Sequence, residues 1–309
     1  MTPRPAATRE FPGRCIIKWM NDLTRRSFLK AAAAIPAGGA LVHAAGEQHS
    51  LKTIGVQLYT VRNILPQKPG ETLKELDQIG YREAECIRDS LDKIWTSLKE
   101  TRLKPVSMHL DTSLFAPAKA GELSAIIADA KQRGFQYLVY PYVAPKERGG
   151  LDVMRKLSQT LNAAGERCRD AGLRLCYHNH AFEFQPMEGS TPFQVLMQET
   201  NKDLVGLEMD VFWVSVAGHD PVEMLRQNSG RVPLVHLKDK AEGTAVQYNE
   251  SVPRTAFKEV GSGTLDFPSI LRAASAAGVQ HYFVEQDATP GDPLVSLRKS
   301  HEYLHALKF

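Results

Sequence analysis

Histidines, carboxylates and one lysine recur in four short apolar segments in the second half of the chain. The segments are Tyr177-His178-Asn179-His180, Glu208-Met209-Asp210, Val235-His236-Leu237-Lys238-Asp239 and Val284-Glu285-Gln286-Asp287. Because side chains two apart on a β-strand point to the same side, each segment presents a pair of polar groups together. Imidazoles and carboxylates that converge from neighbouring strands can enclose a divalent cation. The pattern therefore indicates a metal site.

The elements that must position these groups alternate regularly between strand and helix patterns. We expect strands at Thr53–Tyr59, Arg82–Ile87, Lys104–Leu110, Gln136–Tyr142, Leu173–His180, Leu204–Asp210, Val232–Lys238 and His281–Gln286. We expect helices at Glu71–Ile79, Asp92–Thr101, Ala120–Arg133, Leu151–Ala171, Pro192–Glu199, Pro221–Gln227, Phe267–Ala277 and Pro293–Leu307. Alternation at this pace predicts right-handed βαβ units and a parallel sheet, and eight units close into a single (β/α)8 TIM barrel of the α/β class.

An open, doubly wound sheet is the main rival fold. It is disfavoured because no glycine-rich phosphate loop follows the first strand, and Gly261-Ser262-Gly263 lacks the third glycine of a nucleotide-binding motif. In a TIM barrel the active site lies at the C-terminal ends of the strands, where the four polar segments fall. Residues 241–263 form the longest irregular stretch, and we expect them to be a loop that acts as a lid on that face.

The four segments resemble the strand-end motifs of the xylose-isomerase-like TIM barrels, as do Gly55-Val56-Gln57-Leu58-Tyr59 and Gly261-Ser262-Gly263-Thr264-Leu265-Asp266-Phe267. That group includes ketose 3-epimerases, hydroxypyruvate isomerases, inosose dehydratases and type IV endonucleases. Its sugar epimerases hold one metal with Glu, Asp, His and Glu. The resemblance therefore implies one divalent ion (Mn, Co, Zn or Mg) held by Asp210, His236 and Glu285. The first position is His178 instead of Glu, and His180 and Glu183 are the alternatives there.

The resemblance implies a metal-dependent sugar isomerase or epimerase that removes a proton next to a carbonyl and holds the enediolate on the metal. His178, His180 or Glu285 would move the proton, and Lys238 would polarise an oxygen or anchor a leaving group. Histidine in the first position favours the alternative, a keto-sugar dehydratase or lyase of the inosose dehydratase or 3-keto-glycoside elimination type. The reason is that an imidazole base suits proton abstraction near neutral pH.

Four further residues are candidate substrate contacts: Glu85, His109, Trp213 and Glu183. For three of them a structural role competes. His109 would be a hydrogen-bonded histidine at the rim, Glu85 would form an ion pair inside the barrel, and Trp213 would pack against neighbouring side chains. The sequence leaves these alternatives open.

Residues 1–44 are set apart from the barrel at 51–309 by a segment that resembles a twin-arginine export signal. Thr24-Arg25-Arg26-Ser27-Phe28-Leu29-Lys30 precedes a weakly apolar run from Ala31 to Ala45. We expect cleavage after Ala44 and a periplasmic or extracellular mature protein, with Met20 as an alternative translation start. A short amphipathic helix is the competing interpretation. Pro36, Gly38 and Gly39 interrupt the apolar run, which is too short to span a bilayer. No other segment is a membrane candidate, so no membrane span is expected after cleavage.

The net charge of the chain limits which class of binding partner is expected. The 309-residue chain carries a net charge of +3, but residues 1–44 hold seven basic and two acidic side chains, so the remainder is at −2. A mildly acidic barrel disfavours nucleic acid, and with it a type IV endonuclease-like repair enzyme. We expect a small-molecule sugar or keto-sugar as partner. A non-catalytic sugar-binding barrel is a further alternative, and exposed barrel helices are compatible with a homo-oligomer.

Overall fold

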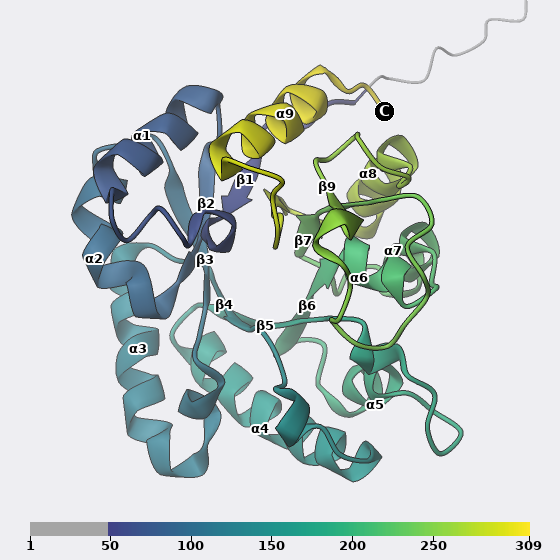
Figure 1. The fold of residues 1–309 in the computed structure, drawn as a ribbon. Coiled ribbons are helices and arrows are strands. Elements are labelled where there is room, and N and C mark those ends of the chain that lie inside the picture. Colours follow the sequence, from purple (N-terminus) through teal and green to yellow (C-terminus); the bar gives the residue numbers. More distant parts are fainter. Residues whose placement is uncertain (1–48) are drawn as a thin grey trace, which may run out of the picture. The chain divides into compact units, whose positions relative to one another are not determined.

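A computed structural model of the chain describes residues 49–309, and the predicted leader lies outside them. Eight strands close into a barrel in the order β1-β10-β7-β6-β5-β4-β3-β2, with every neighbouring pair parallel (Figure 1). Their bounds are β1 Gly55–Gln57, β2 Glu83–Ile87, β3 Lys104–His109, β4 Tyr137–Tyr140, β5 Arg174–His178, β6 Val205–Asp210, β7 Leu234–Leu237 and β10 His281–Val284. The predicted (β/α)8 barrel is confirmed.

All eight expected helices form around this barrel. Their bounds are α1 Pro69–Ile79, α2 Arg88–Lys99, α3 Ala120–Arg133, α4 Leu151–Asp170, α5 Pro192–Glu199, α7 Pro221–Gln227, α8 Phe267–Ala277 and α9 Pro293–Ala306. Amphipathic spacing decides which face is buried: α3 packs through Leu123, Ile126, Ile127 and Ala130. Gly134 ends this helix at a left-handed φ of 89°, a conformation that glycine adopts without steric penalty.

One helix was not expected from the sequence. α6 (Val211–Val216) begins directly after β6 and is buried along its whole length. Asp210 caps it, because Oδ1 accepts hydrogen bonds from Phe212 N at 2.9 Å and Trp213 N at 3.2 Å. No glycine or proline separates strand from helix, so the apolar run gives no sequence signal for the change.

The predicted loop at 241–263 is partly ordered by a short hairpin, in which β8 (Asp239–Lys240) pairs antiparallel with β9 (Phe257–Lys258). The buried Asp239 carboxylate accepts hydrogen bonds from Gly261 N at 3.0 Å and Gly263 N at 2.8 Å. A Cβ on Gly263 would collide with this carboxylate. The glycine motif therefore wraps a carboxylate of the chain itself, which explains its composition without a nucleotide.

A small apolar cluster lies apart from the main core between barrel and helices. We call it the barrel-interior cluster, and it consists of Val106, Tyr137, Val139, Cys176, Leu234 and Phe283. Three of its members precede polar site residues by two positions: Cys176 precedes His178, Leu234 precedes His236, and Phe283 precedes Glu285. The cluster thus lies one layer nearer the N-terminal ends of the strands than the polar groups.

Two further features concern cysteines and membrane spans. Cys86, Cys168 and Cys176 are buried free thiols. Within residues 49–309, every helix is too short or too polar to cross a lipid bilayer.

Candidate active site and metal centre

The four expected metal ligands meet at the C-terminal end of the barrel, and we call them the outer set: His178, Asp210, His236 and Glu285. One ligand atom from each lies within 4.8 Å of those of the others. His178 Nε2 is 3.7 Å from Asp210 Oδ2, His236 Nδ1 is 3.9 Å from the same oxygen, and His236 Nδ1 is 2.8 Å from Glu285 Oε2. All four side chains are buried. Adjacent strands β5, β6 and β7 and the end of β10 therefore deliver two imidazoles and two carboxylates to one point.

The chemistry of the outer set fits a divalent cation. Burial, followed by the neighbouring His236 and His180, lowers the pKa of His178 well below its ordinary value, so this ring keeps a free lone pair. Asp210 Oδ2 is buried and makes its closest polar contact with the Lys238 ammonium, at 2.9 Å. Burial lowers the pKa of His236, but Glu208, Glu85 and Glu285 outweigh it and raise that pKa well above its usual range. The carboxylates of the site thus stabilise a positive charge, which a proton or a metal ion can supply.

Lys238 supplies one positive charge beside the outer set. Its Nζ lies 2.9 Å from Asp210 Oδ2, 2.6 Å from Glu285 Oε2 and 2.8 Å from Asp287 Oδ2. Burial disfavours the ammonium, but Asp210, Asp287 and Glu285 outweigh burial and raise the pKa of Lys238 well above its ordinary value. The lysine is therefore a fixed ammonium with three carboxylate partners.

A cavity of about 730 Å³ opens above these groups. His178, His180, Lys238 and Glu285 contribute to its lining, whereas Asp210 and His236 do not reach its surface. Its other polar and aromatic walls include His109, Asp111, Tyr142, Trp213, Glu250, Arg254, Phe257 and Asp287. His109 and Trp213, two of the four expected substrate contacts, thus face the space that a substrate would enter.

His180 lies beyond the end of β5, although the sequence pattern placed it on the strand. Its ring packs edge-on against Tyr142 at 4.9 Å between centroids and lies 5.4 Å from the ring of Trp213. Burial, and then Lys238, lowers its pKa well below the ordinary value, so the imidazole is neutral. Its Nδ1 has no hydrogen-bond partner among residues 49–309. His180 therefore has the protonation state that a general base needs.

Glu183, one of the expected substrate contacts, is not among the side chains that line the cavity. Its Oε1 accepts a hydrogen bond from Tyr177 Oη at 2.7 Å, and its Oε2 accepts one from His180 N at 2.9 Å. Both oxygens are therefore committed, which also argues against Glu183 as the first metal ligand. Burial raises its pKa to about 8. The side chain fixes the backbone at His180 instead.

Glu85 lies below the cavity and forms the ion pair that was its alternative role. Its Oε1 is 2.5 Å from His236 Nε2 and 3.1 Å from His109 Nε2. Gln57 Nε2 donates to the same oxygen at 2.7 Å, and Ser107 Oγ donates to Oε2. The carboxylate is thus held by four polar side chains in a fully buried position and does not line the cavity.

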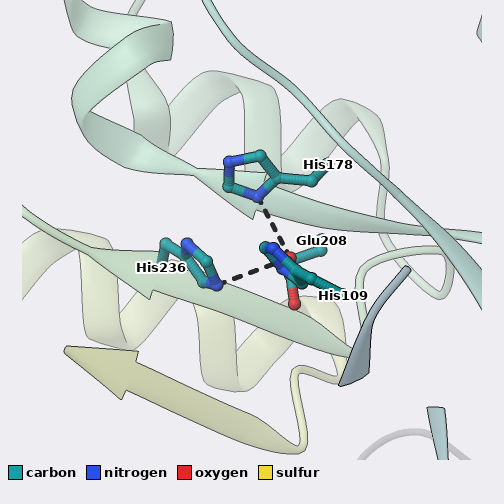
Figure 2. Close-up of side chains that lie close together, drawn as sticks. All are labelled: His109, His178, Glu208 and His236. Carbon is teal, nitrogen blue, oxygen red and sulfur yellow. Dashed lines mark hydrogen bonds and ion pairs between the residues drawn. The ribbon is translucent and has the colours of Figure 1, made fainter. Parts of the chain in front are cut away.

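Glu208 belongs to one of the four polar segments in the sequence, but it was not assigned a role in the site. Its Oε2 lies 2.8 Å from His109 Nε2, 3.0 Å from His178 Nδ1 and 3.4 Å from His236 Nε2 (Figure 2). The available signal was its position two residues before Asp210, which puts both carboxylates on the same side of β6. Gln57 and Ser107 were missed because uncharged polar residues on a strand carry little information alone.

Comparisons with known proteins agree with this architecture. The family model described as the xylose isomerase-like TIM barrel matches residues 71–307. An inosose dehydratase of Geobacillus thermodenitrificans is 27% identical over 154 residues, which is 47% of this chain and 51% of that protein. The chain thus spans about half the length of the curated relatives it matches.

Two solved structures share the fold at low sequence identity. A sugar phosphate isomerase/epimerase from Parabacteroides distasonis superposes with a TM-score of 0.66 at 24% identity, covering 88% of this chain and 98% of that one. The IOLI protein with a bound zinc atom has a TM-score of 0.62 at 14% identity, covering 81% of this chain and 95% of that one. The family match covers most of the chain, so this protein belongs to the xylose isomerase-like TIM barrel family.

Proposed function

We propose that the protein is a divalent-metal-dependent sugar isomerase or epimerase that removes a proton next to a substrate carbonyl. One observation carries the proposal: the outer set, a neutral His180 and the charged Lys238 meet at the floor of one cavity. His178, Asp210, His236 and Glu285 would hold the ion. A bound divalent ion would act as a Lewis acid that lowers the pKa of the C–H bond beside the carbonyl.

Other side chains around the cavity would take the remaining catalytic and binding roles. His180 is placed to accept the proton, because its imidazole is neutral and lines the cavity. Burial raises the pKa of Glu285, but Lys238 and His236 outweigh burial and lower it well below the ordinary value. Glu285 is thus a carboxylate that can orient substrate hydroxyls. Lys238 would donate a hydrogen bond to a substrate oxygen, and Trp213 offers an aromatic face to a sugar ring.

Solvent-deuterium exchange tests this proposal. The Mn²⁺-loaded protein is incubated in D₂O with a panel of free keto-sugars and 3-keto-glycosides, and proton NMR follows the carbon next to the carbonyl. We expect deuterium at that carbon and formation of an isomer or epimer. Asp210→Asn is the matched variant, because asparagine keeps the Oδ1 that caps α6. Full metal occupancy and unchanged exchange in this variant would contradict the assignment of the outer set.

A second candidate is a keto-sugar dehydratase or lyase on the same site. It is favoured by the inosose dehydratase relatives and by the unequal pair of a neutral imidazole and an ammonium. After proton removal by His180, Lys238 would donate a proton to a departing β-hydroxyl or alkoxide. The same NMR experiment separates the two reactions, since elimination gives an unsaturated ketone whereas isomerisation conserves the number of hydroxyl groups.

We also propose that the protein is exported through the twin-arginine route, on the basis of Arg25, Arg26 and the apolar run after them. Replacing both arginines with lysine in the full chain should retain the uncleaved form in the cytoplasm. Cell fractionation with detection of a C-terminal tag measures this. Equal amounts of processed protein outside the cytoplasm in both forms would contradict it.

A further inference from the structure

We propose that the barrel contains a second divalent-cation site one layer below the outer set. Its four ligands would be His109, His178, Glu208 and His236, which we call the inner set. Each ligand comes from a different strand: β3, β5, β6 and β7. The proposal does not depend on which reaction the protein catalyses.

The geometry of the inner set suits a metal with nitrogen preference. One ligand atom from each residue lies within 4.8 Å of those of the others. Glu208 Oε2 is surrounded by three ring nitrogens at 2.8, 3.0 and 3.4 Å (Figure 2). Three imidazoles and one carboxylate form a donor set that binds Zn²⁺ or Co²⁺ more tightly than Mg²⁺ or Mn²⁺. Glu208 and His236 are fully buried, and His109, which lines the cavity, connects the site to that space.

Two buried atoms point to a ligand in this place. His178 Nδ1 lies 3.0 Å from Glu208 Oε2 but makes no hydrogen bond with any residue of the described chain, and its side chain is only 3% exposed. Glu208 Oε1 is likewise buried without a partner in that part of the chain. A network of shared protons accounts for His109 and His236, whose rings hydrogen-bond to Glu208 and Glu85. It leaves His178 Nδ1 unsatisfied, whereas a cation would accept its lone pair.

The two sets share rings but use opposite nitrogens. His178 presents Nδ1 to the inner set and Nε2 to the outer set, while His236 presents Nε2 inward and Nδ1 outward. A neutral imidazole has one lone pair, so each ring can serve one site at a time. One ion would therefore occupy either site. A zinc ion in the inner site would withdraw both imidazoles from the outer site beside the cavity, so zinc should inhibit an enzyme activated by manganese.

Anomalous scattering from crystals of the wild-type protein tests the inner site directly. Crystals are soaked in Zn²⁺ or in Mn²⁺ and measured at each absorption edge. We expect the zinc peak within bonding distance of His109 and Glu208, and the manganese peak beside Asp210 and Glu285. A zinc peak beside Asp210 and Glu285 alone would overturn the inner site and leave the proposed function intact. Failure of the proposed function is separate, since it would appear as absent manganese and absent deuterium exchange.

Calorimetric titration of variants gives a second measurement in solution. The double variant Asp210→Asn/Glu285→Gln should lose Mn²⁺ binding by more than about 100-fold and keep Zn²⁺ affinity within about threefold. His109→Gln should weaken Zn²⁺ binding by more than about 100-fold, because removing even an outer partner of a ligand costs roughly 10- to 100-fold. His281→Gln is the matched control, since His281 pairs with Glu83 outside both sets. Circular dichroism checks that each variant folds. Zinc affinity that falls with the double variant and not with His109→Gln would refute the inner site.

Discussion

The same strands carry the barrel-interior cluster, here the lower layer, and the polar site residues that follow it, here the polar or upper layer. The two layers differ in the effect of burial on stability. Cys176, Leu234 and Phe283 are apolar and fully buried, so burial stabilises them. Two residues further along the same strands, His178, His236 and Glu285 are also buried, but burial disfavours their charged forms. Among the described residues, His178 Nδ1 in this polar layer is buried without a hydrogen-bond partner.

This difference indicates that the layers along the barrel axis contribute differently to stability and to the proposed activity. The apolar layer contributes stability, whereas the polar layer buries charged groups at the expense of stability, as the proposed cation and substrate site would require. Changes in the upper layer should therefore alter activity more than folding, and changes in the lower layer should do the reverse.

The largest expected effect is in the upper layer. Asp210→Asn should lower the rate of deuterium exchange by about 10³-fold, since one charged ligand is lost from the site. Its free energy of unfolding without metal should stay equal or rise, because a buried carboxylate with a raised pKa is removed. Exchange kinetics and urea denaturation measure the two quantities. A large loss of stability in the metal-free variant would contradict the division between the layers.

The strongest test of the lower layer is Leu234→Ala. Removing this buried side chain should lower the free energy of unfolding by about 2–5 kcal/mol, because the surrounding barrel can collapse only partly into the space. Exchange per folded molecule should change little at a temperature where the variant is fully folded. Val295→Ala on α9 is a control at an exposed apolar position, with an effect within about 0.5 kcal/mol. Equal destabilisation by both variants would refute the stabilising role of the cluster.

A smaller effect is expected at Glu183, which positions His180 through a hydrogen bond to its backbone. Glu183→Ala should lower the exchange rate by about tenfold, because the hydrogen bond that fixes His180 N is lost. Glu183→Gln should keep most activity, since its side-chain oxygen can accept the same bond. Steady-state kinetics of both variants provide the comparison. Similar losses in the two variants would show that the carboxyl group has a role other than positioning.

The same residue should impose a pH dependence on stability. Burial raises the pKa of Glu183 to about 8 in the folded chain, above its ordinary value of 4.5. The folded state therefore binds more protons than the unfolded state between these values, so stability falls as pH rises through that window. Wild-type unfolding free energy should decline relative to Glu183→Gln between about pH 4.5 and 8. Denaturation curves that run parallel across this range would contradict the assignment.

The smallest effect is expected at the rim. Arg148 Nη2 lies 2.9 Å from Glu250 Oε2 and ties the loop after β7 to the segment after β4. Glu250→Gln should raise the KM for the sugar by about two- to fivefold with less than about 1 kcal/mol of lost stability, as for a partly exposed ion pair. A large stability loss would place this contact with the lower layer instead.

Much of this organisation was readable from the sequence by itself. Alternation of strand and helix patterns predicted the barrel, because each element must bury one face. The segments that contain Asp210, His236 and Glu285 were expected to lie together because the C-terminal ends of parallel barrel strands meet on one face. The resemblance to the xylose-isomerase-like barrels then singled out these three residues as metal ligands, so their roles did not follow from the periodicity of the chain alone.

Only the tertiary structure decided how deep in the barrel each polar side chain lies and which other side chains it contacts. Periodicity tells which side of a strand Glu208 and Asp210 occupy, but the tilt and stagger of a closed barrel decide which of them meets His109 and which meets Lys238. Glu183 lies in a turn after β5, where no periodicity applies, so its bond to His180 N could not be foreseen. The two nitrogens of His178 likewise face different layers, because ring orientation is set by packing and not by position in the chain.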